Sequence, residues 1–415
     1  MAARRLAARW VLPISGPPIE RGALLLGADG RVVAVGPDAL VPRPPEVPDE
    51  QFADGILLPG LVNTHTHLEL TGLELGRPDP DFGDWIARVR AIKETRSAEE
   101  FLAAAGRGLA DCYASGVTTI ADTGDSGSVI RAMAQAGASG VAYQEVFGPH
   151  PAQLEESLAG LRGRVEEAGC FAGGRVRLGL SPHAPYTVSG PLYAAVADWA
   201  ASDGLPLAVH LAESRAESDL MERGAGRFAE AWHRRGIPLP EGPGRSPVEW
   251  LDRHGVLTER TLCIHLVQVD PADLGRLARR RCAVAHCPLS NAAHGHGAAP
   301  LAGFLSHGLR VGLGTDSVLS VSRLDLLAEA RAARALAGLD AESALALCTL
   351  GGAAALGLER EIGSLEAGKW GDCVVLRAPP VAGSPTEQAL TCGPGDVIAT
   401  FAGGRNVYRA EPVRS

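Results

Sequence analysis

The sequence predicts an α/β protein, a (β/α)8 TIM-like barrel with a small β-sandwich domain formed by both chain ends. Its 415 residues are enough for one barrel of about 250 to 300 residues and an accessory domain. The middle of the chain alternates apolar strand patterns with helical patterns rich in Ala, Leu and Arg, which is typical of βα units around a parallel sheet. Both ends instead carry short strand patterns separated by glycines.

The terminal segments are expected to form one domain together. Residues 1–57 contain GALLLGADGRVVAVG, in which Asp29-Gly30 supplies a turn between two alternating apolar runs. Near the other end, IGSLEAGKWGDCVVLRA and DVIATFAGGRNVYRA follow the last helical segment. We therefore expect residues 1–57 and 361–415 to build the composite β-sandwich domain, and residues 58–360 to build the (β/α)8 barrel domain.

Eight strand patterns occur in order within the barrel segment. They are ILLPGLVNTH, VTTIAD, GVAYQEVF, VRLGLS, LPLAVHL, TLCIH, CAVAH and RVGLGTD. Helix starts are also predicted, since Ser97 with Glu100 forms a capping box and Asp270 is an N-cap directly before a proline. The stretch 223–247 interrupts the alternation and is interpreted as an insertion or active-site lid.

Composition limits the classes of partner. The net charge is -9 and no basic stripe is present, which argues against nucleic acid and anionic membranes and favours a small-molecule substrate. The eight cysteines contain no CxxC pair and are interpreted as reduced thiols. Because no segment approaches the roughly 18 continuous apolar residues of a membrane span, a cytoplasmic protein is expected; a homodimer is left open.

Metal-capable side chains recur where the predicted strands end. In NTHTH, His65 and His67 are two residues apart and so point the same way in an extended segment. His210, His265 and Asp316 end the fifth, sixth and eighth strands. Because a (β/α)8 barrel brings the C-terminal ends of its strands to one rim, these side chains are expected to meet at a divalent-metal site.

Six segments carry a resemblance to a known family. PGLVNTHTH, SPHAPYT, VHLAES, HCPLSN, GLGTDS and GSLEAGKWGDCVVL, in this order, resemble the amidohydrolase superfamily, in its cytosine-deaminase-like and chlorohydrolase-like branch. The resemblance implies one divalent ion, zinc first and Fe²⁺ or Mn²⁺ as alternatives, held by the side chains of four residues: His65, His67, His210 and Asp316. Such an ion lowers the pKa of a water that it holds toward about 7, which makes a nucleophile available at neutral pH.

The resemblance also implies catalytic roles. Glu213, three residues beyond His210, is expected to transfer protons as general acid and base; His265 is expected to orient the attacking water or share that transfer, and Asp316 to be both ligand and catalytic residue. Members that bridge two ions with a carboxylated lysine take it from a middle strand. No lysine occurs between Lys93 and Lys369, so one ion is favoured.

Other residues near these motifs receive weaker interpretations. Glu145 is kept as the alternative bridging ligand of a two-metal site. Substrate contacts are predicted for a set that begins with His183 in SPHAPYT and continues with Glu69, Trp85 and Tyr186. His286 and Asn291 are expected to shape the floor of the pocket. A flexible loop is the simpler interpretation of HGHG, so His294 and His296 are left out of the metal site.

One metal ion beside a carboxylic acid suits attack on a C=N carbon of a heteroaromatic ring and release of its amino group. NTHTHLEL, DWIARV, GLSPHAPYTVS and the Pro-rich stretch before PVEWLD resemble aminodeoxyfutalosine deaminases. S-adenosylhomocysteine and methylthioadenosine deaminases typically carry asparagine shortly after the GTD aspartate, whereas this chain has GTDSVLSVSRLD. An adenine-type nucleoside is therefore favoured. The alternatives are S-adenosylhomocysteine, methylthioadenosine or guanine deamination, chlorohydrolysis or cyclic amide hydrolysis on the same site, and a scaffold protein that has lost the metal.

Overall fold

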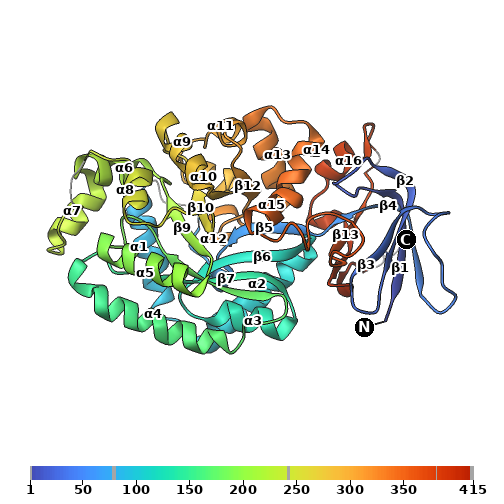
Figure 1. Ribbon diagram of the computed structural model, residues 1–415, viewed down its shortest axis with the longest axis horizontal. Coiled ribbons are helices and arrows are strands. Elements are labelled where there is room, and N and C mark those ends of the chain that lie inside the picture. Colours follow the sequence, from blue (N-terminus) through green and yellow to red (C-terminus); the bar gives the residue numbers. More distant parts are fainter. Residues whose placement is uncertain (1, 77–80, 241–243, 380, 412–415) are drawn as a thin grey trace.

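The computed structural model describes residues 2–76, 81–240, 244–379 and 381–411. Its strands form two separate sheets, one of eight strands and one of seven. Figure 1 shows the helix-covered barrel on one side of the molecule and the second sheet, which carries the chain ends, on the other. The predicted fold class is confirmed.

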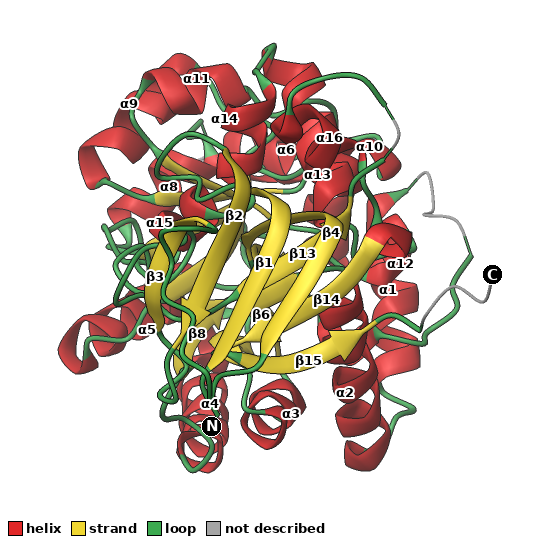
Figure 2. Ribbon diagram, turned by 90° about the vertical axis from the view of Figure 1, so that its right-hand side faces the viewer, coloured by secondary structure: helices red, strands yellow, loops and turns green. Residues whose placement is uncertain are grey.

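The second sheet combines strands from both ends of the chain. Its order is β15-β14-β13-β4-β1-β2-β3 (Figure 2). The strands are β1 (Arg4–Val11), β2 (Ile19–Leu26), β3 (Val32–Pro37), β4 (Asp49–Pro59), β13 (Cys373–Arg377), β14 (Val397–Ala402) and β15 (Arg405–Arg409). The sheet curls so that its two ends approach, since Gly371 N donates to Gly30 O (2.8 Å) and Gly404 N donates to Gly371 O (3.0 Å). One face therefore closes over an apolar core of its own. The division of the chain at residues 57/58 and 360/361 stays a prediction.

The barrel consists of eight parallel strands in sequence order. They are β5 (Leu61–Thr66), β6 (Val117–Gly124), β7 (Ser139–Val146), β8 (Val176–Pro182), β9 (Leu207–Leu211), β10 (Thr261–His265), β11 (Ala283–His286) and β12 (Arg310–Leu313). Each predicted strand is present. Most of their residues are buried, as expected of a parallel sheet with both faces covered. A single Thr66–Asp316 bridge joins the last strand region to the first, and His65 O accepts from the backbone N–H groups of Thr315 (3.1 Å) and Asp316 (3.0 Å).

One residue connects the two sheets directly. Gly60 lies between β4 and β5, so the strand that pairs with β1 and β13 continues into the first barrel strand. A Cβ atom at position 60 would lie 2.1 Å from Thr118 Oγ1, a contact that only glycine avoids.

Helices surround the barrel and fill its connections. They are α1 (Phe82–Lys93), α2 (Ala98–Ala114), α3 (Ser128–Ala136), α4 (Leu154–Gly169), α5 (Gly190–Asp203), α6 (Arg215–Arg223), α7 (Gly226–Arg234), α8 (Pro247–Arg253), α9 (Pro271–Arg280), α10 (Pro288–Ala293), α11 (Leu301–Ser306), α12 (Val318–Val321), α13 (Leu326–Ala337), α14 (Ala341–Leu347), α15 (Leu350–Ala355) and α16 (Pro385–Thr391), with 3₁₀ turns η1 (Leu68–Leu70), η2 (Pro151–Gln153) and η3 (Pro394–Asp396). Both predicted helix starts are confirmed: Ser97 and Glu100 form the capping box of α2, and Asp270 accepts from the Asp273 N–H at the start of α9.

All eight cysteines are free thiols, and seven of them are buried. Within the described residues, no helix is both long enough and apolar enough to span a bilayer.

Candidate metal centre

The side chains that end the barrel strands converge at one rim. His65 comes from β5, His67 directly follows that strand, His210 comes from β9 and Asp316 from the turn after β12. We call these four the ligand cluster. The His65 ring centroid lies 4.7 Å from that of His67 and 4.9 Å from that of His210, and Asp316 Oδ1 lies 3.6 Å from His65 Nε2 and 3.5 Å from His67 Nε2. The structure therefore brings together all four residues that the sequence predicted as ligands.

The donor atoms of the ligand cluster fit a divalent ion. Both ring nitrogens of His65 and Nδ1 of His210 are buried and have no hydrogen-bond partner. One candidate atom each from His65, His67 and Asp316 lies within 4.8 Å of the others, and the same holds for His65, His210 and His265. Three imidazoles and a carboxylate are donors that zinc and its neighbours in the first transition row accept. Unpartnered buried nitrogens are costly unless a cation binds them.

Neighbouring groups orient the ligand cluster. His67 Nδ1 donates to Thr123 O (2.8 Å), which turns Nε2 toward Asp316. On the Asp316 side, Oδ2 accepts from the hydroxyls of Ser290 (2.6 Å) and Ser320 (3.0 Å), which leaves Oδ1 facing the two histidines. Hydrogen bonds of this kind fix ligand tautomers and rotamers in metal sites.

Burial and charge hold these side chains in the protonation states that bind metal. Burial lowers the pKa of His65 to about 4 and that of His210 well below its usual value, so both rings are neutral at pH 7. Burial alone would raise the pKa of Asp316, but the proximity of the His65 and His67 rings outweighs it and lowers that pKa well below its usual range. Neutral imidazole and ionised carboxylate are the forms that coordinate a cation.

Backbone strain is concentrated at the same rim. Ala212, His265 and Asp316 have φ angles of 51°, 74° and 59°, which L-residues rarely adopt. Each follows or ends a strand that contributes to the site. Such conformations cost free energy and persist where the surrounding fold imposes them, commonly at functional sites.

Glu213 lies beside the ligand cluster with its carboxylate buried. Its backbone N–H donates to Glu217 Oε2 (3.0 Å), and Glu217 Oε1 also accepts from Ala212 N (2.7 Å), so Glu217 fixes the turn after β9. His265 Nε2 lies 3.5 Å from Glu213 Oε1, while His265 Nδ1 is hydrogen-bonded to Asn291 Oδ1 (2.9 Å). Burial opposes ionisation of Glu213, but His265 and then His296 outweigh it and lower the pKa to about 2. Glu213 and His265 thus lie together beside the ligand cluster, and their catalytic roles stay predictions.

His183 lies next to His210 on the neighbouring strand end. The two ring centroids are 4.7 Å apart. Thr187 Oγ1 donates to Ala184 O (3.1 Å), so the 2.8 Å contact with His183 Nδ1 is a bond in which Nδ1 donates. The other nitrogen, Nε2, is left as an acceptor. Burial lowers the pKa of His183 to about 3, so the ring is neutral.

Glu145, the alternative bridging residue, approaches His210 from the other side. Its Oε1 is buried, has no hydrogen-bond partner and lies 3.9 Å from His210 Nδ1. Burial raises its pKa well above the usual value. The bridging role stays a prediction.

Aromatic residues line the outer part of the site. Tyr186 is buried and stacks on Phe228 of α7 with centroids 4.3 Å apart, and Trp232 Nε1 donates to Tyr186 O (3.0 Å). Trp85 is buried and lies edge-on to His294 at 5.5 Å. Helix α7 belongs to the stretch 223–247 that was interpreted as a lid, so that stretch packs on the predicted substrate residues; its residues 241–243 lie outside the described part.

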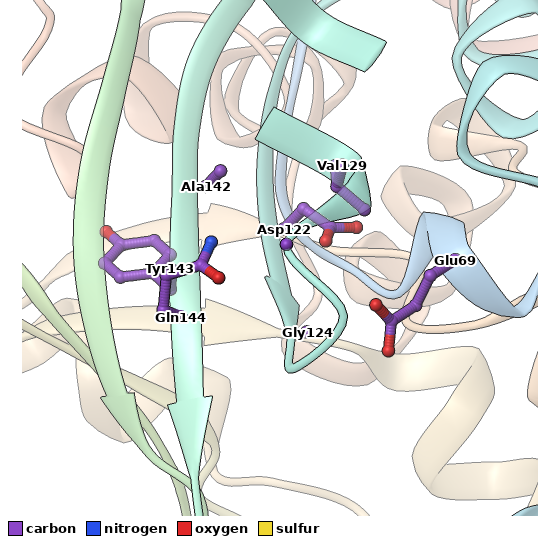
Figure 3. A pocket seen from close by; sticks show the side chains of 8 residues that line it. Glu69, Asp122, Gly124, Val129, Ala142, Tyr143 and Gln144 are labelled. Atoms are coloured by element: carbon purple, nitrogen blue, oxygen red, sulfur yellow. The ribbon is translucent and has the colours of Figure 1, made fainter. Parts of the chain in front are cut away.

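Glu69 has partners that point away from a substrate role. Its carboxylate forms an ion pair with Lys93 and accepts from Ser126 N (3.3 Å) and from the Ser126 hydroxyl. Lys93 also pairs with Asp125. We call these four the lysine cluster. Figure 3 shows the Glu69 side chain from η1 beside the end of β6, near Asp122 and Gly124. The geometry favours a structural role for Glu69. The partners of its carboxylate give no support to the predicted contact with a substrate.

Two histidines that the sequence interpretation set aside lie at the site. His296 Nε2 is 3.5 Å from Glu213 Oε1, and His294 Nε2 is hydrogen-bonded to Ser320 Oγ (3.0 Å), which in turn donates to Asp316. The signal in the sequence was the HGHG pattern itself, which was interpreted as a flexible loop. His286, by contrast, is fully buried, and Asn291 contacts His265 rather than open space.

Known proteins match the chain over almost its whole length. Residues 56–407 match the amidohydrolase family. A 5-methylthioadenosine/S-adenosylhomocysteine deaminase from Moorella thermoacetica is 33% identical over 377 residues, which cover 88% of this chain and 83% of that protein. An aminodeoxyfutalosine deaminase from Deinococcus radiodurans is 34% identical over 358 residues, or 83% of each chain.

Solved structures share the fold. The aminofutalosine deaminase of Helicobacter pylori, in complex with methylthio-coformycin, superposes with a TM-score of 0.85 at 22% identity over 98% of this chain and all of that one. A zinc-bound adenosine deaminase from Xanthomonas campestris gives a TM-score of 0.84 at 24% identity over 98% of this chain and 92% of that one. At these identities the likeness extends to the fold alone.

Proposed function

Since the chain belongs to the amidohydrolase family, a family of hydrolases that act on carbon–nitrogen bonds, we propose that it is a metal-dependent aminohydrolase that removes the amino group of an adenine-type nucleoside. One observation carries the proposal. The ligand cluster converges with unpartnered donor atoms, and the ionised carboxylate of Glu213 lies beside it.

The proposed site holds one divalent ion, and zinc is the first choice. The side chains of His65, His67, His210 and Asp316 would bind it. A divalent ion in such a site supplies an activated water and polarises the bond under attack. Zinc is supported by the donor set and by the zinc-bound relative of the same fold, with Fe²⁺ and Mn²⁺ as the alternatives.

The chain's own residues account for the remaining steps. The Glu213 carboxylate accepts a proton from the attacking water and delivers it to a ring nitrogen of the substrate, and a further proton transfer releases ammonia. His265, held by Asn291, orients the water. His183 presents Nε2 to a hydroxyl of the substrate, while Tyr186 and Trp85 form an aromatic wall that excludes water.

An adenine nucleoside with a 5′ substituent is the proposed substrate, with aminodeoxyfutalosine as the first candidate. Relatives named for aminodeoxyfutalosine and for methylthioadenosine or S-adenosylhomocysteine match at nearly equal identity, 34% and 33%. The absence of asparagine in GTDSVLSVSRLD supports the first. We also propose a cytoplasmic location, which the eight free thiols support.

A substrate screen tests this function. Purified protein is incubated with aminodeoxyfutalosine, methylthioadenosine, S-adenosylhomocysteine, adenosine, guanine, a chlorotriazine and a cyclic amide, while ammonia, chloride and the ultraviolet spectrum are followed. The expected result is ammonia release from at least one adenine nucleoside, abolished in a His65→Ala variant. Chloride release alone, or cyclic amide hydrolysis without ammonia from aminopurines, would replace the proposal with the corresponding alternative.

A further inference from the structure

The loop that follows α10 is a turn whose backbone conformation is set by two glycines. It contains His294-Gly295-His296-Gly297, and the two glycines have φ angles of 67° and 105°. Added Cβ atoms at these glycines would meet nothing closer than 3.7 Å, so the backbone conformation, and not space, requires glycine there. The pattern HGHG therefore encodes a turn of defined shape around His296.

Hydrogen bonds tie this turn to the barrel rim. His296 N donates to Asn291 O (2.9 Å), and Gln268 Nε2 donates to His296 O (2.7 Å). Gln268 N in turn donates to Ala212 O (2.7 Å), the residue directly before Glu213. The backbone that carries His296 is thus connected through one glutamine to the backbone that carries Glu213.

The His296 side chain points at Glu213. Only 5% of the side chain is exposed, and Nε2 lies 3.5 Å from Glu213 Oε1 with no closer partner. Phe82 of α1 covers the ring edge-on, with centroids 4.5 Å apart. His265 approaches the same oxygen at the same distance of 3.5 Å. Two imidazoles therefore flank one oxygen of the carboxylate.

We propose that His296 is a positioning residue that, together with His265, holds Oε1 of Glu213 so that the carboxylate presents Oε2 for proton transfer. The catalytic part of this inference rests on the proposed function, whereas the contact itself does not. A carboxylate held by one imidazole can rotate about its last side-chain bond; held from two sides, it keeps one orientation.

A kinetic comparison tests the positioning role. His296→Ala, His296→Gln and, as a matched control, His307→Ala are assayed with the nucleoside that the wild-type protein deaminates fastest. His307 is an exposed histidine directly after α11, and its Nδ1 donates to Gly303 O. For His296→Ala we expect kcat to fall about 10- to 100-fold, the size typical of losing a supporting side chain in a metal site, with metal content and KM within about twofold. Glutamine should recover most of the loss, because its amide N–H₂ can donate to Oε1.

Equal kcat in the alanine and wild-type proteins, or no recovery by glutamine in a folded, metal-loaded protein, would overturn the proposal.

A spectroscopic measurement tests the contact without any substrate. In zinc-loaded protein with ¹⁵N-labelled histidine, the His296 ring signals are those missing from His296→Gln. We expect Glu213→Gln to shift them, and the matched change Glu222→Gln, at an exposed glutamate, to leave them in place. Unshifted signals in Glu213→Gln would overturn the inference. If the wild-type protein deaminates no nucleoside, the proposed function fails while this measurement still decides whether His296 holds Glu213.

Discussion

The barrel contains two buried polar clusters that differ in one respect. In the ligand cluster, histidine nitrogens and one aspartate oxygen face one another without hydrogen-bond partners between them. In the lysine cluster, the cation of Lys93 is paired with both Glu69 and Asp125, so each carboxylate has a partner within the cluster. Both lie where barrel strands end: the ligand cluster draws on β5, β9 and β12, and the lysine cluster lies beside the ends of β5 and β6.

This difference distinguishes a cluster that binds a ligand from a cluster that stabilises the fold. A buried cluster whose donors remain unpaired is stable only when something else binds them, whereas a cluster that pairs its own charges needs no ligand. Lys93 illustrates the second case, because the charges of Glu69 and Asp125 outweigh burial and raise its pKa. The lysine cluster anchors the end of α1, whose first turn supplies Phe82 and Trp85 to the site.

The largest effect is expected from removing a ligand. His65→Ala and Asp316→Asn should lose the metal and lower turnover more than about 1,000-fold, because three remaining donors bind a divalent ion weakly. Metal analysis and ammonia release measure both effects, with His307→Ala as the control. Wild-type protein is expected to carry close to one equivalent of divalent metal, and freshly purified protein without any would contradict the comparison.

An intermediate effect is expected from Glu213→Gln. The amide cannot take up the proton, so turnover should fall about 100- to 10,000-fold, while metal content stays at the wild-type level. Metal analysis beside steady-state kinetics separates this variant from the ligand variants. Turnover close to wild type would refute proton transfer by Glu213.

The smallest effect on turnover is expected from the lysine cluster. Lys93→Met removes the cation that pairs with the buried carboxylate of Glu69 and the half-buried carboxylate of Asp125, so the free energy of unfolding should fall by about 3 kcal/mol, with metal retained. Arg90→Met, on the same helix, breaks only an exposed pair with Glu94 and should change it by less than about 0.5 kcal/mol. Denaturant titration compares the two, and loss of metal in Lys93→Met would erase the distinction between the clusters.

Periodic signals predicted the strands and the metal-capable side chains that share a rim, whereas the set of four ligands followed from the family resemblance. His65 and His67 alternate with Thr66 along β5, so their shared direction follows from strand geometry, and the eight strand patterns fixed which residues share a rim. The membership in the amidohydrolase superfamily is confirmed by the match over residues 56–407.

Long-range contacts account for what the sequence did not predict. From the sequence, Glu69 was predicted to contact the substrate. In the structure it pairs with Lys93, which lies 24 residues later in the chain. His296 lies 83 residues from Glu213, and no local pattern shows that the turn between Gly295 and Gly297 directs its ring at that carboxylate. Contacts between side chains that lie far apart in the sequence can be identified only from the folded structure.

The seam between the first and last barrel strands has a consequence for the order of biosynthesis. His65 and Asp316 lie on opposite sides of that seam, joined by the backbone bonds from Thr315 and Asp316 to His65 O. During translation the N-terminal ligands emerge about 250 residues before the aspartate that completes the set. A nascent chain therefore cannot complete the set of four ligands until its last barrel strand has been made, and we expect metal to bind after the barrel has been synthesised.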